Sequence, residues 1–254
     1  MMLPKTFLTM PIAHRGFHVR VQGRIENSLE AAQAAMNAGY GIECDVQLTA
    51  DGQAAVFHDY DMKRLTGQSG AIQTRTLSVV QDMTLSGSNN KIPSLSDLLN
   101  LVGGKVPLLI EIKDQDGAMG NNVGKLEEAT AKALADYEGP VAVMSFNPHS
   151  IATMARLAPN VPRGLTTSAY LAKDWGLLPA AVREDLRQIP DYARTDSCFI
   201  SHEAKDLDRP RVTELKASGA AILCWTIRSA EAEAEARRIA DNITFEGYTA
   251  RTIP

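Results

Sequence analysis

The chain has 254 residues, which is enough for one large barrel or two small domains. Hydrophobic residues make up 44% of the chain and charged residues 22%, the balance of a globular protein with a full core. A net charge of −4 gives no reason to expect nonspecific binding to nucleic acid, and no stretch approaches the roughly 20 apolar residues of a membrane span.

Short apolar runs alternate with helical stretches along the chain. Strands are predicted at 9–14, 41–47, 106–113, 141–145, 163–167, 198–201, 221–226 and 243–246. Helices are predicted at 28–37, 95–101, 125–137, 150–157, 179–188, 210–217 and 230–239. Eight strands that alternate with helices are typical of a (β/α)8 TIM barrel rather than of an open sheet. We therefore predict an α/β protein with a single barrel domain over 1–254.

One segment departs from this alternation after the second predicted strand. Asp51-Gly52 suits a two-residue type I′ turn, which leads into a further strand at 54–59. Such a turn pairs residues whose numbers sum to 103, so we expect His58 to lie opposite Asp45 on the same face. Roughly thirty polar and Gly/Ser-rich residues follow, and a loop of that length is usually functional, so we expect an inserted cap at about 60–93.

The three cysteines, Cys44, Cys198 and Cys224, stand in apolar or strand-like runs without CxxC spacing. An odd number cannot all pair, so we expect buried, reduced thiols of a reducing cytosol. The first ten residues hold one lysine and a short apolar patch, and a cleaved signal would end close to His14. We therefore expect a cytoplasmic protein without stable membrane association.

Acidic side chains alternate with apolar ones in two of the predicted strands. Because side chains of a strand point alternately to its two faces, Glu43 and Asp45 share one face, as do Glu111 and Lys113. Charges within such apolar runs are costly unless they are paired or bind a ligand. Three carboxylates that converge at one end of a barrel would repel one another without a cation. Oxygen ligands alone favour one Mg²⁺ or Ca²⁺ over zinc.

Two histidines accompany these carboxylates. His14 ends the first apolar run, and the expected hairpin brings His58 to Asp45. Because histidine titrates near neutrality, the pair can act as acid and base around a P–O bond. Arg15 and Lys113 are the cations that would neutralise phosphate oxygens.

Aromatic residues mark the ends of two later strands. Phe146 follows the run at 141–145, and Trp225 lies near the end of the run at 221–226. Both are candidates for lining a substrate pocket, and packing in the core or at the rim explains them equally well.

A series of short motifs runs through the chain in a fixed order. They are His-Arg-Gly at 14–16, Glu-Asn-Ser at 26–28, Gly-Ile-Glu-Cys-Asp-Val-Gln-Leu-Thr-Ala-Asp-Gly at 41–52, Phe-His-Asp at 57–59, Arg-Leu-Thr-Gly at 64–67, Ile-Pro-Ser-Leu at 92–95, Ile-Glu-Ile-Lys at 110–113, Ser-Phe-Asn at 145–147 and Trp-Thr-Ile at 225–227. In these motifs the chain resembles the glycerophosphodiester phosphodiesterase family over nearly its whole length.

The resemblance implies a TIM barrel with a small cap inserted after His58-Asp59. It also implies roles for particular residues: a divalent cation on Glu43, Asp45 and Glu111, acid–base catalysis by His14 and His58, phosphate binding by Arg15 and Lys113, and ordering of the 14–15 segment by Glu26.

The implied reaction is metal-dependent hydrolysis of glycerophosphodiesters, such as glycerophosphocholine and glycerophosphoethanolamine, to sn-glycerol 3-phosphate and an alcohol. The nucleophile is water or the glycerol 2-hydroxyl. One alternative is the same chemistry on lysophospholipids or glycerophosphoinositol, and the polar composition of the expected cap speaks against a lysolipid. Another is a catalytically silent barrel that binds a phosphate ligand, although no histidine or carboxylate of the set is missing.

Three motifs depart from the family pattern. The family usually has Asp where this chain has Asn147, and Asn where this chain has Arg228. Near its end the family reads Asp-Gly-Ile-Ile-Thr-Asp-Tyr-Pro where this chain reads Asp-Asn-Ile-Thr-Phe-Glu-Gly-Tyr at 241–248. We expect these changes to lie on the leaving-group side and at the rim, and so to affect substrate preference rather than the chemistry.

Overall fold

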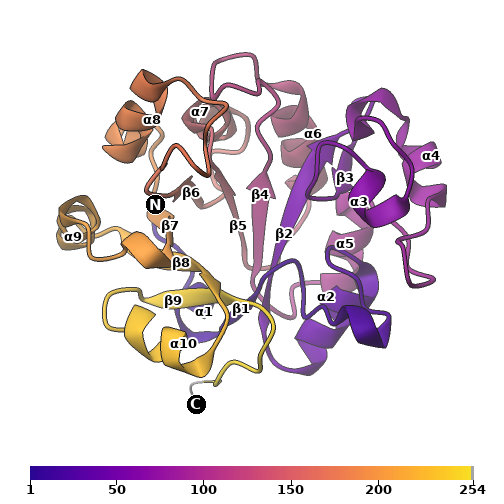
Figure 1. The fold of residues 1–254 in the computed structure, drawn as a ribbon, viewed down its shortest axis with the longest axis horizontal. Coiled ribbons are helices and arrows are strands. Elements are labelled where there is room, and N and C mark those ends of the chain that lie inside the picture. Colours follow the sequence, from indigo (N-terminus) through magenta and orange to yellow (C-terminus); the bar gives the residue numbers. More distant parts are fainter. Residues whose placement is uncertain (253–254) are drawn as a thin grey trace.

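Eight parallel strands close into a barrel in the computed structural model, which describes residues 1–252 (Figure 1). The strands of the barrel are β1 (Ile12–Ala13), β2 (Gly41–Leu48), β4 (Leu108–Ile112), β5 (Val141–Ser145), β6 (Arg163–Thr167), β7 (Phe199–Glu203), β8 (Ala221–Ile227) and β9 (Asn242–Phe245). The ring closes because β1 pairs with both β2 and β9. The predicted TIM barrel is confirmed.

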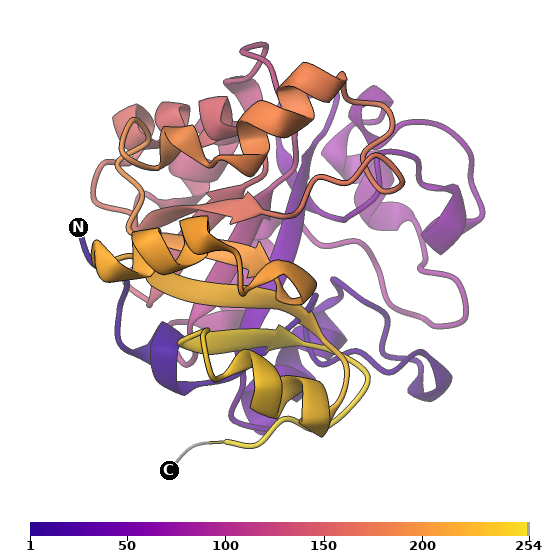
Figure 2. The same ribbon diagram turned by 60° about the vertical axis from the view of Figure 1, so that its left-hand side comes forward.

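Helices surround the strands on the outside of this ring (Figures 1 and 2). They are α2 (Leu29–Asn37), α5 (Leu95–Val102), α6 (Lys125–Leu134), α7 (Pro148–Leu157), α8 (Ala180–Arg187), α9 (Pro210–Ala217) and α10 (Ala230–Ala236), and α1 (Thr6–Thr9), α3 (Lys63–Thr66) and α4 (Leu77–Asp82) are shorter. None of the helices within residues 1–252 is long and apolar enough to cross a membrane.

Local sequence explains where several helices begin. The Ser28 hydroxyl accepts a hydrogen bond from the Ala31 amide at the start of α2. At the start of α5, Ser94 and Asp97 form a capping box, in which each side chain accepts from the other residue's amide. Such caps satisfy amide groups that have no partner inside the helix, so the predicted starts of these helices agree with the observed ones.

The first predicted strand is only partly correct. Residues 9–14 were expected to be extended, but α1 ends at Thr9 and the strand is confined to Ile12–Ala13. Phe7 of α1 is buried with side chains of the barrel interior, and the Asn242 side chain donates hydrogen bonds to the carbonyls of Phe7 and Met10. The start of the chain therefore packs against the amino-terminal end of the barrel instead of extending a strand.

The hairpin register predicted from Asp51-Gly52 is wrong by one residue. Strand β3 (Ala54–Val56) pairs with β2 so that Val46 faces Val56 and Leu48 faces Ala54, and these numbers sum to 102. The Gly52 amide donates to the Thr49 carbonyl, and Gly52 has a left-handed φ of 72°. The loop is thus a three-residue turn with Gly in the left-handed position. The Phe57 amide, not His58, bonds to the Asp45 carbonyl, at 3.0 Å.

The segment between β3 and α5 has a small apolar core of its own. It contains α3, α4 and a short 3-10 turn at Ile72–Thr74, and it lies at one side of the barrel (Figure 1). The buried side chains of this second core are Ile25, Ala55, Phe57, Met62, Leu65, Ile72, Val80, Met83, Leu85 and Ile92. The segment expected to be a polar loop is therefore in part helical. Its apolar residues are widely spaced among polar ones, so the composition alone did not predict a core.

The three cysteines are free thiols, and Cys44 and Cys224 are buried as expected. Cys198 is partly exposed.

Candidate active site

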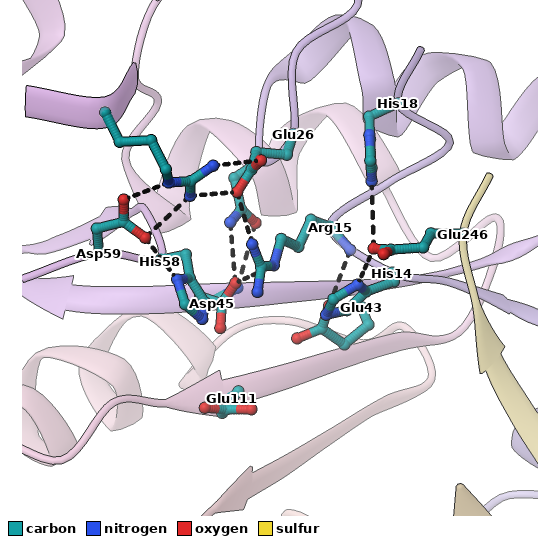
Figure 3. Close-up of polar contacts among 12 residues, drawn as sticks. His14, Arg15, His18, Glu26, Glu43, Asp45, His58, Asp59, Glu111 and Glu246 are labelled. Carbon is teal, nitrogen blue, oxygen red and sulfur yellow. Dashed lines mark hydrogen bonds and ion pairs between the residues drawn. The ribbon is translucent and has the colours of Figure 1, made fainter. Parts of the chain in front are cut away.

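Three carboxylates from two adjacent strands meet inside the carboxyl-terminal end of the barrel (Figure 3). Glu43, Asp45 and Glu111 each offer an oxygen atom, and these atoms all lie within 4.8 Å of one another. The register of β2 against β4 explains the meeting, because it sets Asp45 directly beside Glu111. All three side chains are buried. The convergence expected from strand alternation is present.

Two cations partly balance this negative charge. Lys113 Nζ lies 2.8 Å from a Glu111 oxygen and 3.5 Å from Asp45. Arg15 Nε lies 3.4 Å from Asp45, and the Arg15 backbone amide donates to Glu43 at 2.8 Å. Three carboxylates against two cations leave a net negative charge in a buried site.

The pKa shifts follow from burial and from these neighbours. Burial, together with repulsion from Asp45 and Glu111, raises the pKa of Glu43 well above its ordinary value. Burial would also raise the pKa of Asp45, but Lys113, His58 and Arg15 hold it below its usual range. For Lys113, burial is outweighed by Glu111 and Asp45, which raise its pKa. The charges in this site are therefore strongly interdependent.

A tight backbone turn positions Arg15. Residues Arg15 and Gly16 both have positive φ angles, 55° and 78°. A Cβ on Gly16 would lie 2.8 Å from the Ala31 backbone carbon, so glycine is needed where this turn meets α2. The turn aims the Arg15 guanidinium at Glu26, which it contacts at 2.7 Å.

Glu26 is the centre of a network of ion pairs (Figure 3). It accepts hydrogen bonds from Arg15 and, through both carboxylate oxygens, from Arg64 on α3. Burial opposes its ionisation, yet Arg64 and Arg15 lower the pKa of Glu26 to about 2. Arg64 also donates to Asp59 at 2.6 Å and 2.9 Å. Glu26 thus lies beside Arg15, where the resemblance put it, and the network also ties the segment after β3 to the site.

Each of the two candidate histidines has a carboxylate at its Nδ1 atom. His58 Nδ1 lies 2.7 Å from Asp59, and the Gln47 side chain donates to the His58 carbonyl at 3.0 Å. His14 Nδ1 lies 2.5 Å from Glu246, and its Nε2 is 4.0 Å from Glu43. His58 does not face Asp45 across the hairpin, because Phe57 takes that place, but the charge of His58 contributes to lowering the pKa of Asp45.

A cavity of about 960 Å³ opens beside these charged groups. Its charged lining includes His58, Asp59, Glu111 and Lys113. Its apolar and aromatic lining comes from the loops after β4, β5 and β6, namely Met119, Phe146 and Trp175. Tyr60, Asp61, Lys63 and Arg64 from the segment after β3 complete the lining, with Asp114.

The aromatic residues near the cavity pack against one another. The ring centroid of Phe146 lies 4.9 Å from that of Trp175 and 5.5 Å from that of the half-buried Trp225. The Trp225 indole donates to the Ser201 carbonyl at 3.0 Å. Of the two aromatic candidates, Phe146 lines the cavity and Trp225 contacts Phe146.

Two of the departures from the family pattern do not lie where we expected. Asn147 is fully buried, caps α7 and donates to Asp114 at 2.8 Å, so it acts in the loop framework and not at the rim. Glu246 contacts His14 and is therefore part of the charged centre. Glu246 was expected at the leaving-group side or the rim; the available signal for its true place was the closure of the predicted barrel, which sets the strand at 243–246 beside the strand that ends at His14.

Asp59, Arg64 and Trp175 also lie at the site, and none of them has a role predicted from the sequence. Asp59 could have been found because it directly follows His58, and Arg64 because it begins the motif at 64–67. Trp175 stands in a long loop with no motif, and only the fold brings it to Phe146.

Comparison with known proteins gives a consistent result. The model of the "Glycerophosphoryl diester phosphodiesterase family" matches residues 14–243. A glycerophosphodiester phosphodiesterase from Caldanaerobacter subterraneus is 32% identical over 176 residues, covering 66% of this chain and 70% of the relative. One from Bacillus subtilis is 26% identical over 260 residues, covering 94% and 81%.

Solved structures agree at the level of the fold. A phosphodiesterase from Oleispira antarctica, in complex with the product sn-glycerol-3-phosphate, has a TM-score of 0.74 at 24% identity and covers 94% of both chains. A glycerophosphodiester phosphodiesterase from Thermotoga maritima has a TM-score of 0.69 at 21% identity and covers 93% of this chain and 94% of its own. With the family model matched along most of its length, this chain belongs to the glycerophosphoryl diester phosphodiesterase family and is an enzyme of that class.

Proposed function

We propose that this enzyme hydrolyses glycerophosphodiesters such as glycerophosphocholine and glycerophosphoethanolamine to sn-glycerol 3-phosphate and an alcohol. The observation that carries the proposal is the meeting of three buried carboxylates with two carboxylate-paired histidines at one end of the barrel. The product bound by the Oleispira antarctica relative supports the choice of sn-glycerol 3-phosphate.

A divalent cation, Mg²⁺ or Ca²⁺, fits the carboxylate cluster. Glu43, Asp45 and Glu111 supply only oxygen ligands, and their mutual repulsion is the cost that a cation would remove. When bound, a divalent cation would supply Lewis-acid stabilisation of the phosphate charge.

The chain's own cations would hold the phosphate. Lys113 lines the cavity and lies between Asp45 and Glu111, so its charge is fixed at the charged end of the cavity. Arg15 is fixed by Glu26 and Asp45. Fixed cations of this kind stabilise the charge that develops on phosphate oxygens without having to reorganise.

We assign the proton transfers from the positions of the two histidines. The His14 side chain is 14% exposed and has its Nε2 beside Glu43, whereas the His58 side chain is 31% exposed and lines the cavity. His14 would take the proton of the attacking oxygen, from water or from the glycerol 2-hydroxyl, as the P–O bond to it forms. His58 would give a proton to the leaving alcohol as the second P–O bond breaks.

The alcohol half of the substrate would occupy the aromatic side of the cavity. The carboxylates that line the cavity are all engaged: Asp59 with His58 and Arg64, Glu111 with Lys113, and Asp61 and Asp114 with backbone amides. Choline methyl groups would pack on the aromatic faces of Phe146 and Trp175. Asp61 and Asp114 bond to backbone amides rather than to a cation and could accept a primary ammonium, so we expect glycerophosphocholine and glycerophosphoethanolamine both to be accepted.

The segment after β3 would act as a cap over the cavity. Residues 1–254 would form one domain, of which positions 253 and 254 lie outside the described residues. The cap role is supported by the residues that it contributes to the cavity, Tyr60, Asp61, Lys63 and Arg64.

Lysophospholipids are a second candidate substrate. Leu171 and Leu177, in the loop that carries Trp175, are 42% and 100% exposed. An exposed apolar loop beside apolar cavity residues could hold an acyl chain. This favours a lysolipid more than the polar composition of the cap did. The structural facts give no comparable support for glycerophosphoinositol or for a silent binding barrel.

A substrate panel tests these choices. Glycerophosphocholine, glycerophosphoethanolamine, glycerophosphoinositol and lysophosphatidylcholine would be compared by kcat/KM, with quantification of the phosphate product and of the alcohol. Release of sn-glycerol 3-phosphate from the first two supports the proposal, and activity on lysophosphatidylcholine alone would overturn it. A protein that binds these compounds without turnover of any of them would be a silent barrel.

A further inference from the structure

Glu246 connects three side chains that are distant in the sequence. One of its oxygens lies 2.5 Å from His14 Nδ1 and 3.7 Å from His18 Nε2. The other accepts from Arg228 at 2.8 Å and 2.7 Å (Figure 3 draws the histidine side of this cluster). Glu246 directly follows β9, which pairs with β1, and the His14 amide donates to the Phe245 carbonyl at 2.9 Å. The barrel closure itself thus sets Glu246 beside His14.

The same arrangement occurs at the other histidine. His58 Nδ1 bonds to Asp59, and Asp59 accepts from the guanidinium of Arg64. The two histidines therefore have matching supports, a carboxylate at Nδ1 and an arginine on that carboxylate. At His58 the carboxylate is the next residue in the chain, while at His14 it is supplied from 232 residues away.

The carboxylate of Glu246 has a cationic partner of its own. Arg228 Nη2 lies 2.7 Å and its Nε 2.8 Å from the Glu246 oxygen that does not contact His14. This ion pair holds the carboxylate at its end remote from the histidine.

We propose that Glu246 is a positioning residue for His14, and that Arg228 holds Glu246 in place. This inference rests on the proposed function. An Nδ1–H donated to Glu246 fixes the ring orientation and leaves Nε2, which faces Glu43, free to accept a proton. Without the carboxylate, His14 could adopt the other tautomer or turn towards solvent. Arg228 keeps Glu246 from turning towards His18, its other neighbour.

Substitution of Glu246 tests the role. Glu246→Gln and Glu246→Ala should lower kcat by at least tenfold, up to the roughly 10²–10⁴-fold expected for loss of His14 itself. KM for glycerophosphocholine should change less than about twofold, because phosphate binding is assigned to other residues. Glu246→Asp should recover part of the activity, and Arg228→Ala should cause a smaller loss of kcat. Glu235→Gln is the control, because it breaks an exposed pair between Glu235 of α10 and Arg238, which follows that helix.

A double-mutant comparison separates positioning from a general structural effect. In a His14→Ala background, Glu246→Gln should cost no further activity, since there is no imidazole left to orient. Nitrogen NMR of the histidine side chains gives a second readout: the Nδ1–H signal of His14 should be present in the parent protein and altered in Glu246→Ala.

The outcomes distinguish this inference from the proposed function. A parent enzyme that hydrolyses no glycerophosphodiester would refute the proposed function. An active parent whose Glu246→Gln variant keeps its kcat, or whose Glu246→Gln loss is equal in both backgrounds, would refute the inference alone.

Discussion

The two ends of the barrel interior differ sharply although the same strands form both. On β4, Leu109 and Glu111 point to the same side, two residues apart. Leu109 belongs to an apolar cluster with Phe7, Ile12, Phe199 and Leu223, while Glu111 belongs to the carboxylate cluster. The apolar packing inside the barrel lies at its amino-terminal end, and the proposed chemistry at its carboxyl-terminal end.

The difference shows how the fold tolerates a charged centre. Three buried carboxylates are costly, and two cations offset only part of that cost. The apolar cluster at the amino-terminal end, called the floor below, and the packing of the helices on the strands supply the stability that the charged end does not. Changes at the floor should therefore alter stability and leave the chemistry, and changes at the charged end should do the reverse.

Removal of divalent cations should have the largest effect at the charged end. Exhaustive chelation should abolish turnover, because Glu43, Asp45 and Glu111 would repel one another and the substrate phosphate. Mg²⁺ or Ca²⁺ should restore it, and Glu111→Gln should weaken binding of that cation in calorimetry without lowering the Tm of the metal-free protein. Full activity with no metal by elemental analysis would exclude a metal role.

Loss of either histidine should be the next largest effect. His14→Ala and His58→Ala should each lower kcat by roughly 10²–10⁴-fold with little change in Tm. With a nitrophenyl leaving group, His58→Ala should recover much of its activity because protonation of that group is not needed, whereas His14→Ala should not. Equal recovery of both variants would contradict the assignment of base and acid.

A change at the floor should show the opposite pattern. Leu223→Ala removes a fully buried side chain of the same apolar cluster and should lower the free energy of unfolding by about 2–5 kcal/mol. The variant that remains folded should keep its kcat, measured well below its Tm, because the strand neighbours of Leu223 are Ser201 and Asn242, which have no proposed role at the site. A loss of kcat that exceeds the folded fraction would mean that the two ends are not independent.

The ion-pair network around Glu26 should make the free energy of unfolding depend on pH. This effect should be smaller than that of the substitution in the apolar cluster. The pKa of Glu26 is about 2 in the folded protein and about 4.5 in an unfolded chain. A lowered folded pKa stabilises the protein above pH 4.5, and that contribution is lost as the pH falls towards 2. Denaturant unfolding of the metal-free protein should show that the free energy of unfolding falls over this pH range. In Glu26→Gln the free energy of unfolding should depend less on pH. Identical pH profiles would show that Glu26 contributes nothing to stability.

Much of the fold could be predicted because its signals are local. Strands β5 and β6 have the predicted bounds: each run starts directly after a proline, Pro140 or Pro162, and the run at 141–145 is apolar. The helix caps at Ser28 and Ser94 are likewise readable from neighbouring residues. The hairpin register failed because one glycine can end a two-residue turn or occupy the extra position of a three-residue turn, and only the pairing decides between them.

By itself the sequence determined that strands alternate with helices and which strand positions carry charged residues. It thereby determined which carboxylates, histidines and cations could form a site. Strand alternation is a local property, and it put Glu43 with Asp45 and Glu111 with Lys113. Only the tertiary structure decided the partners that come from elsewhere. Closure of β9 onto β1 brings Glu246 to His14, and the loop after β6 brings Trp175 to Phe146. A closed barrel already implies that its last strand lies beside its first, but the side chains that meet there depend on the register of the two strands, and the Trp175 contact depends on the path of a loop without a motif. No pattern of neighbouring residues encodes either.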